Sequence, residues 1–203
     1  MKLMKLFPKV ISLSELKDVD GLEKLRNLDL KDNMGNKSGK NAYILNKPEY
    51  SKLKGIIEVL LNEHFYKVYN PKDFENIELY VTQSWVNHTE EGGYHHRHSH
   101  PNSILSGVLY LNIDKNSDNI TFFREQSRPD TLLDFIPEEY NLYNSSAWTV
   151  SGLNVGDIVI FPSILEHEVE IREGSGTPRI SLAFNSFVKG NIGVYNDYTE
   201  LQI

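Results

Sequence analysis

From residue 77 onward, the chain is built from short runs of apolar, β-branched and aromatic residues. Clusters of Gly, Asn, Asp and Pro separate these runs, as is typical of turns between strands. The expected strands span residues 77–86, 103–112, 119–123, 147–150, 157–162, 165–171 and 179–188. Regularly spaced short strands with turn signals predict a β-sandwich or a small β-barrel, and not a parallel α/β sheet.

Residues 1–76 show a different pattern, with apolar residues at helical spacing. One expected helix covers residues 14–26 and another covers residues 49–65. The polar segment KDNMGNKSGKN at residues 31–41 lies between them and is predicted to be a mobile or substrate-facing loop. We therefore expect one compact domain, mainly β, with a helical support region at residues 1–76 and a β core at residues 77–203.

A histidine-rich segment precedes the expected strand at residues 103–112. The sequence YHHRHSHP places His96, His98 and His100 two residues apart. If the backbone is extended there, alternate side chains point to one face with a repeat of about 6.6 Å, so two or three imidazoles can converge. Imidazole is the commonest protein ligand for metals. The spacing therefore predicts a metal site.

A second segment carries a further histidine and an arginine. The sequence GDIVIFPSILEHEVEI contains His167, and Arg179 follows twelve residues later, across what is predicted to be a hairpin with a Gly-rich turn. The arginine guanidinium is a planar, permanently charged fork that matches a carboxylate. The two residues together indicate a metal site beside an anion site.

Composition excludes several classes of protein. The chain has 203 residues, of which 39% are hydrophobic and 24% charged, so it can bury a sizeable core. Its net charge of −7 and its pI near 5.5 argue against a general affinity for nucleic acids, which requires a basic surface. The chain contains no cysteine, which leaves His, Asp and Glu as the candidate metal ligands.

The first residues, MKLMKLFPKVI, lack an apolar run as long as that of a signal peptide, and Pro8 interrupts the run that exists. No segment of the sequence approaches the roughly 18 apolar residues of a membrane span. We therefore expect a cytoplasmic protein that does not associate with membranes. A homodimer is one oligomeric state that the sequence allows.

The order of these motifs resembles that of the Fe(II)- and 2-oxoglutarate-dependent dioxygenases: an H-x-H before a strand, a DIVIFP strand, a distal histidine and a strand that begins Arg-x-Ser. More narrowly, HSHPNSILSGVLYLN resembles the prolyl-4-hydroxylase-like branch and a group of bacterial and phage oxygenases with an HxHP…SGVYYL signature. The resemblance covers residues 78–190. It implies a double-stranded β-helix, a cupin-like jelly roll with the metal at its open end, and the host cytoplasm as location if a phage encodes the chain.

The resemblance implies that His98, His100 and His167 are the metal ligands. The usual triad is H-x-D/E…H, with two histidines and one carboxylate, whereas His100 stands at the carboxylate position here. Three neutral imidazoles leave the charge of an Fe(II) centre at +2, which dianionic 2-oxoglutarate would neutralise. The alternatives are a shifted ligand pair, His96 and His98, or a carboxylate from elsewhere in the chain. The candidate carboxylates are Glu90, Glu91 and Glu166.

The same resemblance implies a binding site for 2-oxoglutarate. Arg179 would bind its distal carboxylate, Tyr110 would assist, and Ser181 and Asn102 would complete the pocket. Taken singly, each of these residues could instead be structural. The order in which they follow the H-x-H motif, within an all-β pattern, favours the functional interpretation.

The resemblance implies an enzyme that uses Fe(II), 2-oxoglutarate and O2 to hydroxylate a C–H bond of a protein, peptide or small-molecule substrate, with release of succinate and CO2. A prolyl side chain is one candidate target. The long insertion at residues 124–147 is predicted to act as a lid or binding loop. Two alternatives remain: a three-His cupin-type dioxygenase that does not use 2-oxoglutarate, and a non-catalytic β-barrel binding module.

Overall fold

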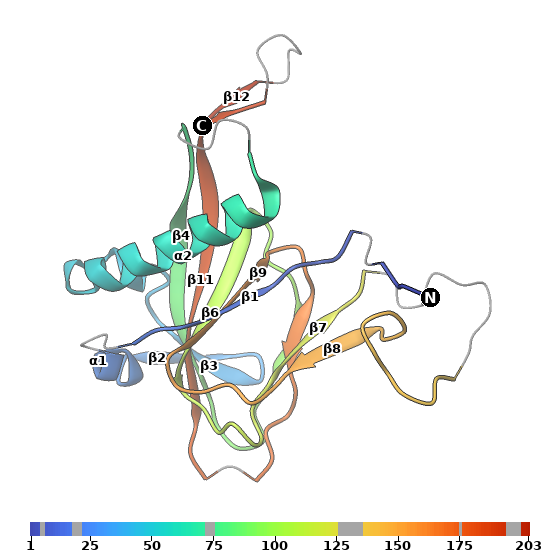
Figure 1. Ribbon diagram of the computed structural model, residues 1–203. Helices are drawn as coiled ribbons and strands as arrows, with labels where there is room; N and C mark the ends of the chain where they lie inside the picture. The colour runs from blue at the N-terminus through green and yellow to red at the C-terminus, as the bar shows by residue number, and fades with distance from the viewer. Residues whose placement is uncertain (5–6, 18–21, 72–75, 126–135, 175, 194–199) are drawn as a thin grey trace.

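The computed structural model describes all residues except 5–6, 18–21, 72–75, 126–135, 175 and 194–199. Its body consists of two antiparallel β-sheets that pack face to face, with a long helix on the outer face of the larger sheet (Figure 1). The chain therefore forms three layers: helix, major sheet and minor sheet.

The major sheet has seven strands in the order β1-β9-β6-β11-β4-β3-β2, and a short eighth strand, β12, pairs with β11. Their bounds are β1 Ser12–Glu15, β2 Leu30–Asn33, β3 Asn36–Gly39, β4 Ile77–Thr89, β6 Leu105–Asn112, β9 Asp157–Pro162, β11 Arg179–Ile192 and β12 Leu201–Gln202. Every pairing between these strands is antiparallel. The longest pairing joins β4 and β11, which run beside each other through the centre of the molecule.

The minor sheet has four strands in the order β5-β10-β7-β8. Their bounds are β5 His95–His98, β7 Ile120–Phe123, β8 Ala147–Val150 and β10 His167–Val169. Between β4 and β11, the chain passes repeatedly from one sheet to the other. The eight strands from β4 to β11 lie in two facing sheets and, connected in this way, form the double-stranded β-helix that the family resemblance implied.

Side chains of the central strands alternate between the two faces of the major sheet, because successive residues of a strand point in opposite directions. In β6, Leu105 and Leu109 belong to the core under the helix, whereas Val108 and Tyr110 belong to the core between the sheets. Both faces are covered, so nearly all residues of β6 and β9 are buried. This explains why these strands are almost continuously apolar.

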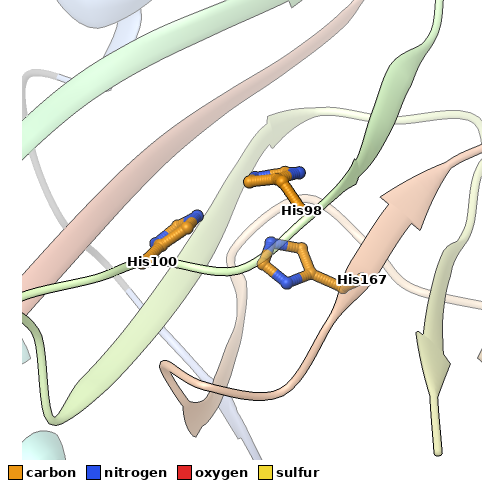
Figure 2. Close-up of side chains that lie close together, drawn as sticks. All are labelled: His98, His100 and His167. Carbon is orange, nitrogen blue, oxygen red and sulfur yellow. The ribbon is translucent and has the colours of Figure 1, made fainter. Parts of the chain in front are cut away.

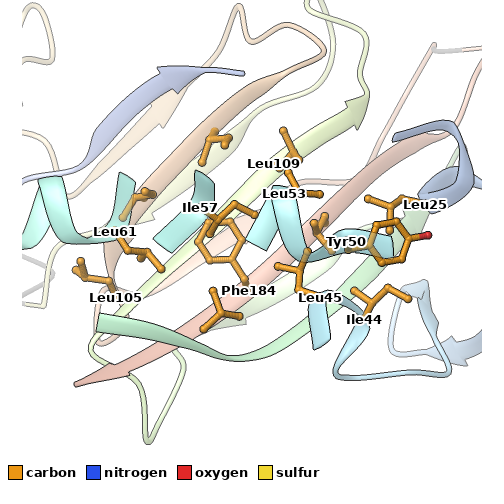
Figure 3. Close-up of a cluster of buried hydrophobic side chains, with 14 of the residues drawn as sticks. Leu25, Ile44, Leu45, Tyr50, Leu53, Ile57, Leu61, Leu105, Leu109 and Phe184 are labelled. Atoms are coloured by element: carbon orange, nitrogen blue, oxygen red, sulfur yellow. The ribbon is translucent and has the colours of Figure 1, made fainter. Parts of the chain in front are cut away.

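The helix layer is α2, Ser51–Tyr69, whose buried residues Leu53, Ile57 and Leu61 repeat every four positions and face the major sheet (Figure 3). Two 3₁₀ turns precede it, η1 Ile44–Asn46 and η2 Pro48–Tyr50. At its end, the helix is capped by Asn70, which adopts a left-handed conformation and donates its backbone N–H to the carbonyl of Tyr66.

Gly107 in β6 lies directly opposite Phe184 of β11. A Cβ atom at Gly107 would lie 2.3 Å from the Phe184 ring and 2.9 Å from the carbonyl oxygen of Val159. The glycine in mid-strand therefore makes room for an aromatic side chain of the core.

The seven predicted strands of residues 77–203 are confirmed. The helix expected at residues 49–65 is also confirmed, as α2. The helix expected at residues 14–26 is wrong: its first residues belong to β1, which pairs with β9, and the described helix α1 covers Leu22–Arg26. The loop expected at residues 31–41 is largely a hairpin of β2 and β3 that extends the major sheet beyond β4.

None of the helices in the described ranges is long and apolar enough to cross a membrane.

Candidate metal centre and co-substrate pocket

Three histidines from separate parts of the chain meet between the two sheets (Figure 2). His98 is the last residue of β5, His167 is the first residue of β10, and His100 lies in the connection between β5 and β6. One ring nitrogen from each lies within 4.8 Å of those of the other two. In the described part of the chain, no other three His, Asp or Glu side chains come together in this way.

The pairing of β5 with β10 brings two of these residues together, because His98 and His167 are direct partners across the two strands. The register then shifts, so that His95 pairs with Val169. Between these two pairs, His96 and Arg97 of β5 lie opposite the single residue Glu168 of β10, as in a β-bulge. As a result, His95 lines the same cavity as His98, while His96 is exposed.

A hydrogen bond to Nδ1 orients each of the three rings. The Nδ1 atom of His98 lies 2.7 Å from the carbonyl oxygen of His96, and that of His167 lies 3.0 Å from the carbonyl oxygen of Leu165. The Nδ1 atom of His100 lies 2.6 Å from Oδ1 of Asn185. These oxygens carry no proton, so each Nδ1 must donate, and the lone pair of each Nε2 is left available. Metal-binding histidines are typically oriented in this way.

Burial keeps the imidazoles neutral. Desolvation lowers the pKa of His167 to about 3 and that of His100 to about 4, and it also lowers the pKa of His98. The pKa of His95 falls to about 3, first because of burial and then because of its neighbouring histidines. A metal binds neutral imidazole, so protons do not compete for these ligands near neutral pH.

The carboxylates considered as alternative ligands are engaged elsewhere. Glu166 forms an ion pair with Arg97, and Glu91 accepts a hydrogen bond from the backbone N–H of Gly174. Glu90 lies 3.3 Å from His88 and is exposed. None of them joins the cluster of three histidines among the described residues.

A cavity extends from the histidines along the inner face of the major sheet. Side chains from alternate positions of two paired strands form its floor, because Trp85 lies opposite Ala183 and Asn87 lies opposite Ser181. Further along, Thr89 lies opposite Arg179. The cavity therefore runs from an imidazole cluster at one end to a guanidinium group at the other.

Arg179 is buried, with 4% of its surface exposed, and it forms no ion pair with any described carboxylate. Its guanidinium carbon lies 5.2 Å from the centre of the Tyr110 ring. The hydroxyl group of Tyr110 and Nε of Arg179 are buried without a hydrogen-bond partner in the described structure. A buried charge is normally paired, so this corner of the cavity suits an anionic ligand.

Tyr110 is fully buried, and burial raises the pKa of its hydroxyl group, although the nearby Arg179 partly opposes this effect. The hydroxyl group therefore stays protonated and can donate a hydrogen bond. Tyr110 and Arg179 lie together because both flank Ser181: Tyr110 is its partner on β6, and Arg179 precedes it by two residues on β11.

The structure brings most of the expected co-substrate residues together but not all of them. Arg179 and Ser181 line the cavity, and Tyr110 lies beside Arg179. Asn102 instead occupies the exposed turn before β6, where it adopts a positive φ of 58°, and it does not line the cavity.

Two polar residues of the site, Asn87 and Asn185, were not among the candidate site residues of the sequence. Asn185 contacts His100, and Asn87 lines the cavity with an Oδ1 atom that has no hydrogen-bond partner in the described structure. A sequence signal for Asn185 exists: the even spacing from Arg179 through Ser181 and Ala183 to Asn185 places all four on one face of a strand.

Comparison with protein families identifies the chain. The family described as "Putative 2OG-Fe(II) oxygenase" matches residues 83–185, half of the chain. This range contains the three histidines, Arg179 and Tyr110. A comparison with curated proteins gave no match.

Several solved structures share this architecture. A prolyl-4-hydroxylase from Pseudomonas putida is 15% identical, with a TM-score of 0.56 over 88% of this chain and 94% of its own. The α-ketoglutarate-dependent epimerase SnoN from nogalamycin biosynthesis is 13% identical, with a TM-score of 0.61 over 93% of this chain and 81% of its own. HygX from Streptomyces hygroscopicus, with nickel, 2-oxoglutarate and hygromycin B bound, is 11% identical, with a TM-score of 0.58 over 88% of this chain and 82% of its own.

At these identities the likeness shows the shared fold, and the family match shows the relationship. Three neutral imidazoles with free Nε2 atoms fit a divalent transition metal, and the unpaired Arg179 fits a carboxylate. The chain therefore belongs to the 2OG-Fe(II) oxygenase family and is a 2-oxoglutarate-dependent dioxygenase that uses Fe(II), 2-oxoglutarate and O2.

Proposed function

We propose that His98, His100 and His167 hold Fe(II) through their Nε2 atoms and that the enzyme hydroxylates a C–H bond of its primary substrate. The convergence of the three rings and the engagement of each Nδ1 atom support this ligand set. The shifted pair, His96 and His98, is disfavoured because His96 is exposed. In this proposal no carboxylate ligand is needed, and the net charge of the loaded site is +2.

The co-substrate binds at the other end of the cavity. Arg179 and the hydroxyl group of Tyr110 hold the distal carboxylate of 2-oxoglutarate, and Ser181 lies on the cavity floor between them and the histidines. The observation that carries the proposal is the buried guanidinium of Arg179, which has no described carboxylate partner and shares a cavity with three neutral imidazoles. A dianionic ligand satisfies both the guanidinium and the metal charge.

Bound iron supplies the activation of O2, coupled to the decarboxylation of 2-oxoglutarate to succinate and CO2. The residues of the chain bind and orient the reactants. Arg179 and Tyr110 would fix one end of the co-substrate, the three histidines would hold the metal at the other, and the apolar Val108 and Ile120 help to exclude water from the cavity.

For the primary substrate, we propose a protein or peptide, with a prolyl side chain as the first candidate. The resemblance of the HSHPNSILSGVLYLN segment to the prolyl-4-hydroxylase-like branch supports this choice, as does the similar Pseudomonas putida prolyl-4-hydroxylase. The insertion at 124–147, expected to be a lid, lies partly outside the described residues; its described part presents the exposed side chains of Tyr140 and Tyr143.

We further propose that residues 77–203 form the catalytic core and that residues 1–76 support it. All of the proposed ligands lie in the former segment. The latter contributes β1, β2 and β3 to the edges of the major sheet and α2 to its outer face.

Binding of N-oxalylglycine, an inert analogue of 2-oxoglutarate, to the Mn(II)-loaded protein tests the proposed activity against its alternatives. We expect stoichiometric binding that requires the metal. A three-His dioxygenase of the cupin type would bind Mn(II) but not N-oxalylglycine, and a binding module without chemistry would not require the metal. Succinate release in the presence of proline-containing peptides, followed by mass spectrometry for a gain of one oxygen atom, then tests the substrate class.

A further inference from the structure

A cluster of uncharged polar side chains contacts the Nδ1 edge of His100. Its members are Ser103, Ser106, Ser163 and Asn185. Ser106 and Ser163 have no exposed surface, and Asn185 is 8% exposed. We propose that Asn185 is a positioning residue: it holds a proton on Nδ1 of His100 and thereby keeps Nε2 unprotonated and directed to the metal. The inference rests on the metal site of the proposed function.

Asn185 is itself held in place by two features of the fold. Its Oδ1 atom lies 2.6 Å from Nδ1 of His100 and also accepts a hydrogen bond of 2.8 Å from the hydroxyl group of Ser106. Asn185 and Ser106 are direct partners across β11 and β6, so the sheet register fixes their separation. The amide oxygen therefore faces the imidazole without depending on a flexible loop.

Of the two side chains that contact Nδ1, only Asn185 determines where the imidazole proton lies. A hydroxyl group such as that of Ser106, 2.9 Å from Nδ1, can by itself donate or accept, and here its one proton goes to Oδ1 of Asn185. The hydroxyl group of Ser106 also contacts that of Ser163, which in turn contacts that of Ser103, at 2.7 Å each. Because hydroxyl groups can rotate, this chain of contacts can adapt to either imidazole tautomer. The amide oxygen only accepts, so the contact with Nδ1 is favourable only if the imidazole donates.

His100 differs in this respect from the other two ligands. The Nδ1 atoms of His98 and His167 contact backbone carbonyl groups, which are supplied by residues two positions earlier in the chain. His100 lies outside any strand, and side chains provide its partners. A single side-chain substitution can therefore change the tautomer of this ligand alone.

The first test measures the tautomer directly. In the metal-free protein, long-range ¹H–¹⁵N NMR correlations of His100 should show a proton on Nδ1. Asn185→Leu keeps the number and branching of the side-chain heavy atoms but removes the acceptor, and we expect it to allow the Nε2-protonated form. Asn185→Asp keeps an acceptor at the same place and should retain the Nδ1 proton. If the leucine variant does not fold, Asn185→Ala takes its place.

The second test measures Co(II) affinity and the visible spectrum of the bound ion. Removing a residue that orients a ligand typically weakens metal binding by about 10–100-fold, so we expect a loss of this size in Asn185→Leu and a loss below roughly threefold in Asn185→Asp. The control is Ser186→Ala, which removes a buried hydrogen bond to the carbonyl group of Leu105 without touching His100. It should lower stability but leave Co(II) affinity and spectrum unchanged.

The outcomes separate this inference from the metal site on which it rests. Wild-type tautomer and Co(II) affinity in Asn185→Leu would overturn the positioning role, provided that His100→Ala binds Co(II) weakly. An equal loss of affinity in Ser186→Ala would also overturn it, because the effect would then be structural. Wild-type Co(II) affinity in His100→Ala would instead remove His100 from the metal site itself.

Discussion

The two faces of the major sheet differ sharply in chemistry, although the same strands supply both. On β11, Ile180, Leu182 and Phe184 face α2 and join an apolar core. On the other face, Arg179 lines the cavity and Asn185 contacts His100. Both sets are buried. The even-numbered residues of this strand therefore contribute to stability, and its odd-numbered residues contribute to the site.

The difference shows where the fold tolerates unfavourable burial. The cavity face keeps Tyr110 Oη, Asn87 Oδ1 and Arg179 Nε buried without a hydrogen-bond partner in the described structure. Each such atom costs about 1–3 kcal/mol of stability when nothing pairs with it. The apolar packing on the opposite face offsets this loss of stability. The sheet can therefore hold unpaired polar groups in the positions where they would bind a ligand.

The largest expected effect concerns the metal. His167→Ala should abolish stoichiometric binding of Mn(II) or Co(II), because His167 is the buried member of the cluster and its loss leaves two of the three ligands. Metal content after gel filtration and calorimetric titration would measure it. His96→Ala is the matched control, since His96 lies on the same segment but is exposed; a comparable loss in this variant would indicate the shifted ligand pair.

A substitution on the helix-facing side of the major sheet should lower stability and leave metal binding intact. Phe184→Ala removes a fully buried ring from the core and should lower the free energy of unfolding by about 3–5 kcal/mol. The folded protein should still bind metal and 2-oxoglutarate, because Phe184 points away from the cavity. Urea unfolding and ligand titration below the melting temperature would test the separation of the two faces. Loss of ligand affinity in a folded variant would contradict it.

Acidification should destabilise the metal-free protein through the cavity face. Burial lowers the pKa of His167 to about 3, well below the roughly 6.5 of an unfolded histidine. Its contribution to stability is complete above pH 6.5 and is lost as the pH falls toward 3, because only the unfolded state takes up the proton in that range. For each buried histidine of this kind, the free energy of unfolding falls by about 1.4 kcal/mol per pH unit.

Urea unfolding of the metal-free protein between pH 7.5 and pH 5 would measure this dependence. His167→Asn should flatten the slope, since it removes one of the groups that remain neutral in the folded state. A stability that stays constant over this range in the wild-type protein would show that the buried imidazoles do not titrate as inferred.

The smallest effect is expected for Tyr110→Phe. The substitution removes one neutral donor and should weaken 2-oxoglutarate binding by about fivefold, since such a hydrogen bond is worth about 1 kcal/mol. Stability without the ligand should stay the same or rise slightly, because the buried hydroxyl group has no hydrogen-bond partner in the described structure. A clear loss of stability instead would indicate that Tyr110 serves the core and not the ligand.

The sequence predicted the parts of the fold that depend on local pattern. The strands at the centre of the sheets are strongly apolar or alternate, and turn residues bound them. The β2–β3 hairpin escaped prediction because its sequence is polar, with no alternation; it forms by adding to the exposed edge of β4. β1 was missed for a related reason, since Ser12–Glu15 becomes a strand by pairing with β9.

The site residues likewise fall into two groups: those that the sequence predicted and those that depend on strand pairing. His98, His100, His167 and Arg179 could be proposed because their order in the chain resembles that of a known family. The contact of Asn185 with His100 depends on the register between β11 and β6, and the inward position of His95 depends on the irregularity in β5. Sequence spacing does not reveal cross-strand register, so these roles emerged only from the structure.

The most direct test of the central claim is the affinity of the Mn(II)-loaded protein for 2-oxoglutarate, measured by calorimetry for wild type and Arg179→Gln. Hydrogen bonds to a charged group are worth about 1.5–3 kcal/mol. We therefore expect the substitution to weaken 2-oxoglutarate binding by roughly two orders of magnitude while Mn(II) affinity stays near that of the wild type. Unchanged 2-oxoglutarate affinity in Arg179→Gln would contradict the proposed co-substrate site.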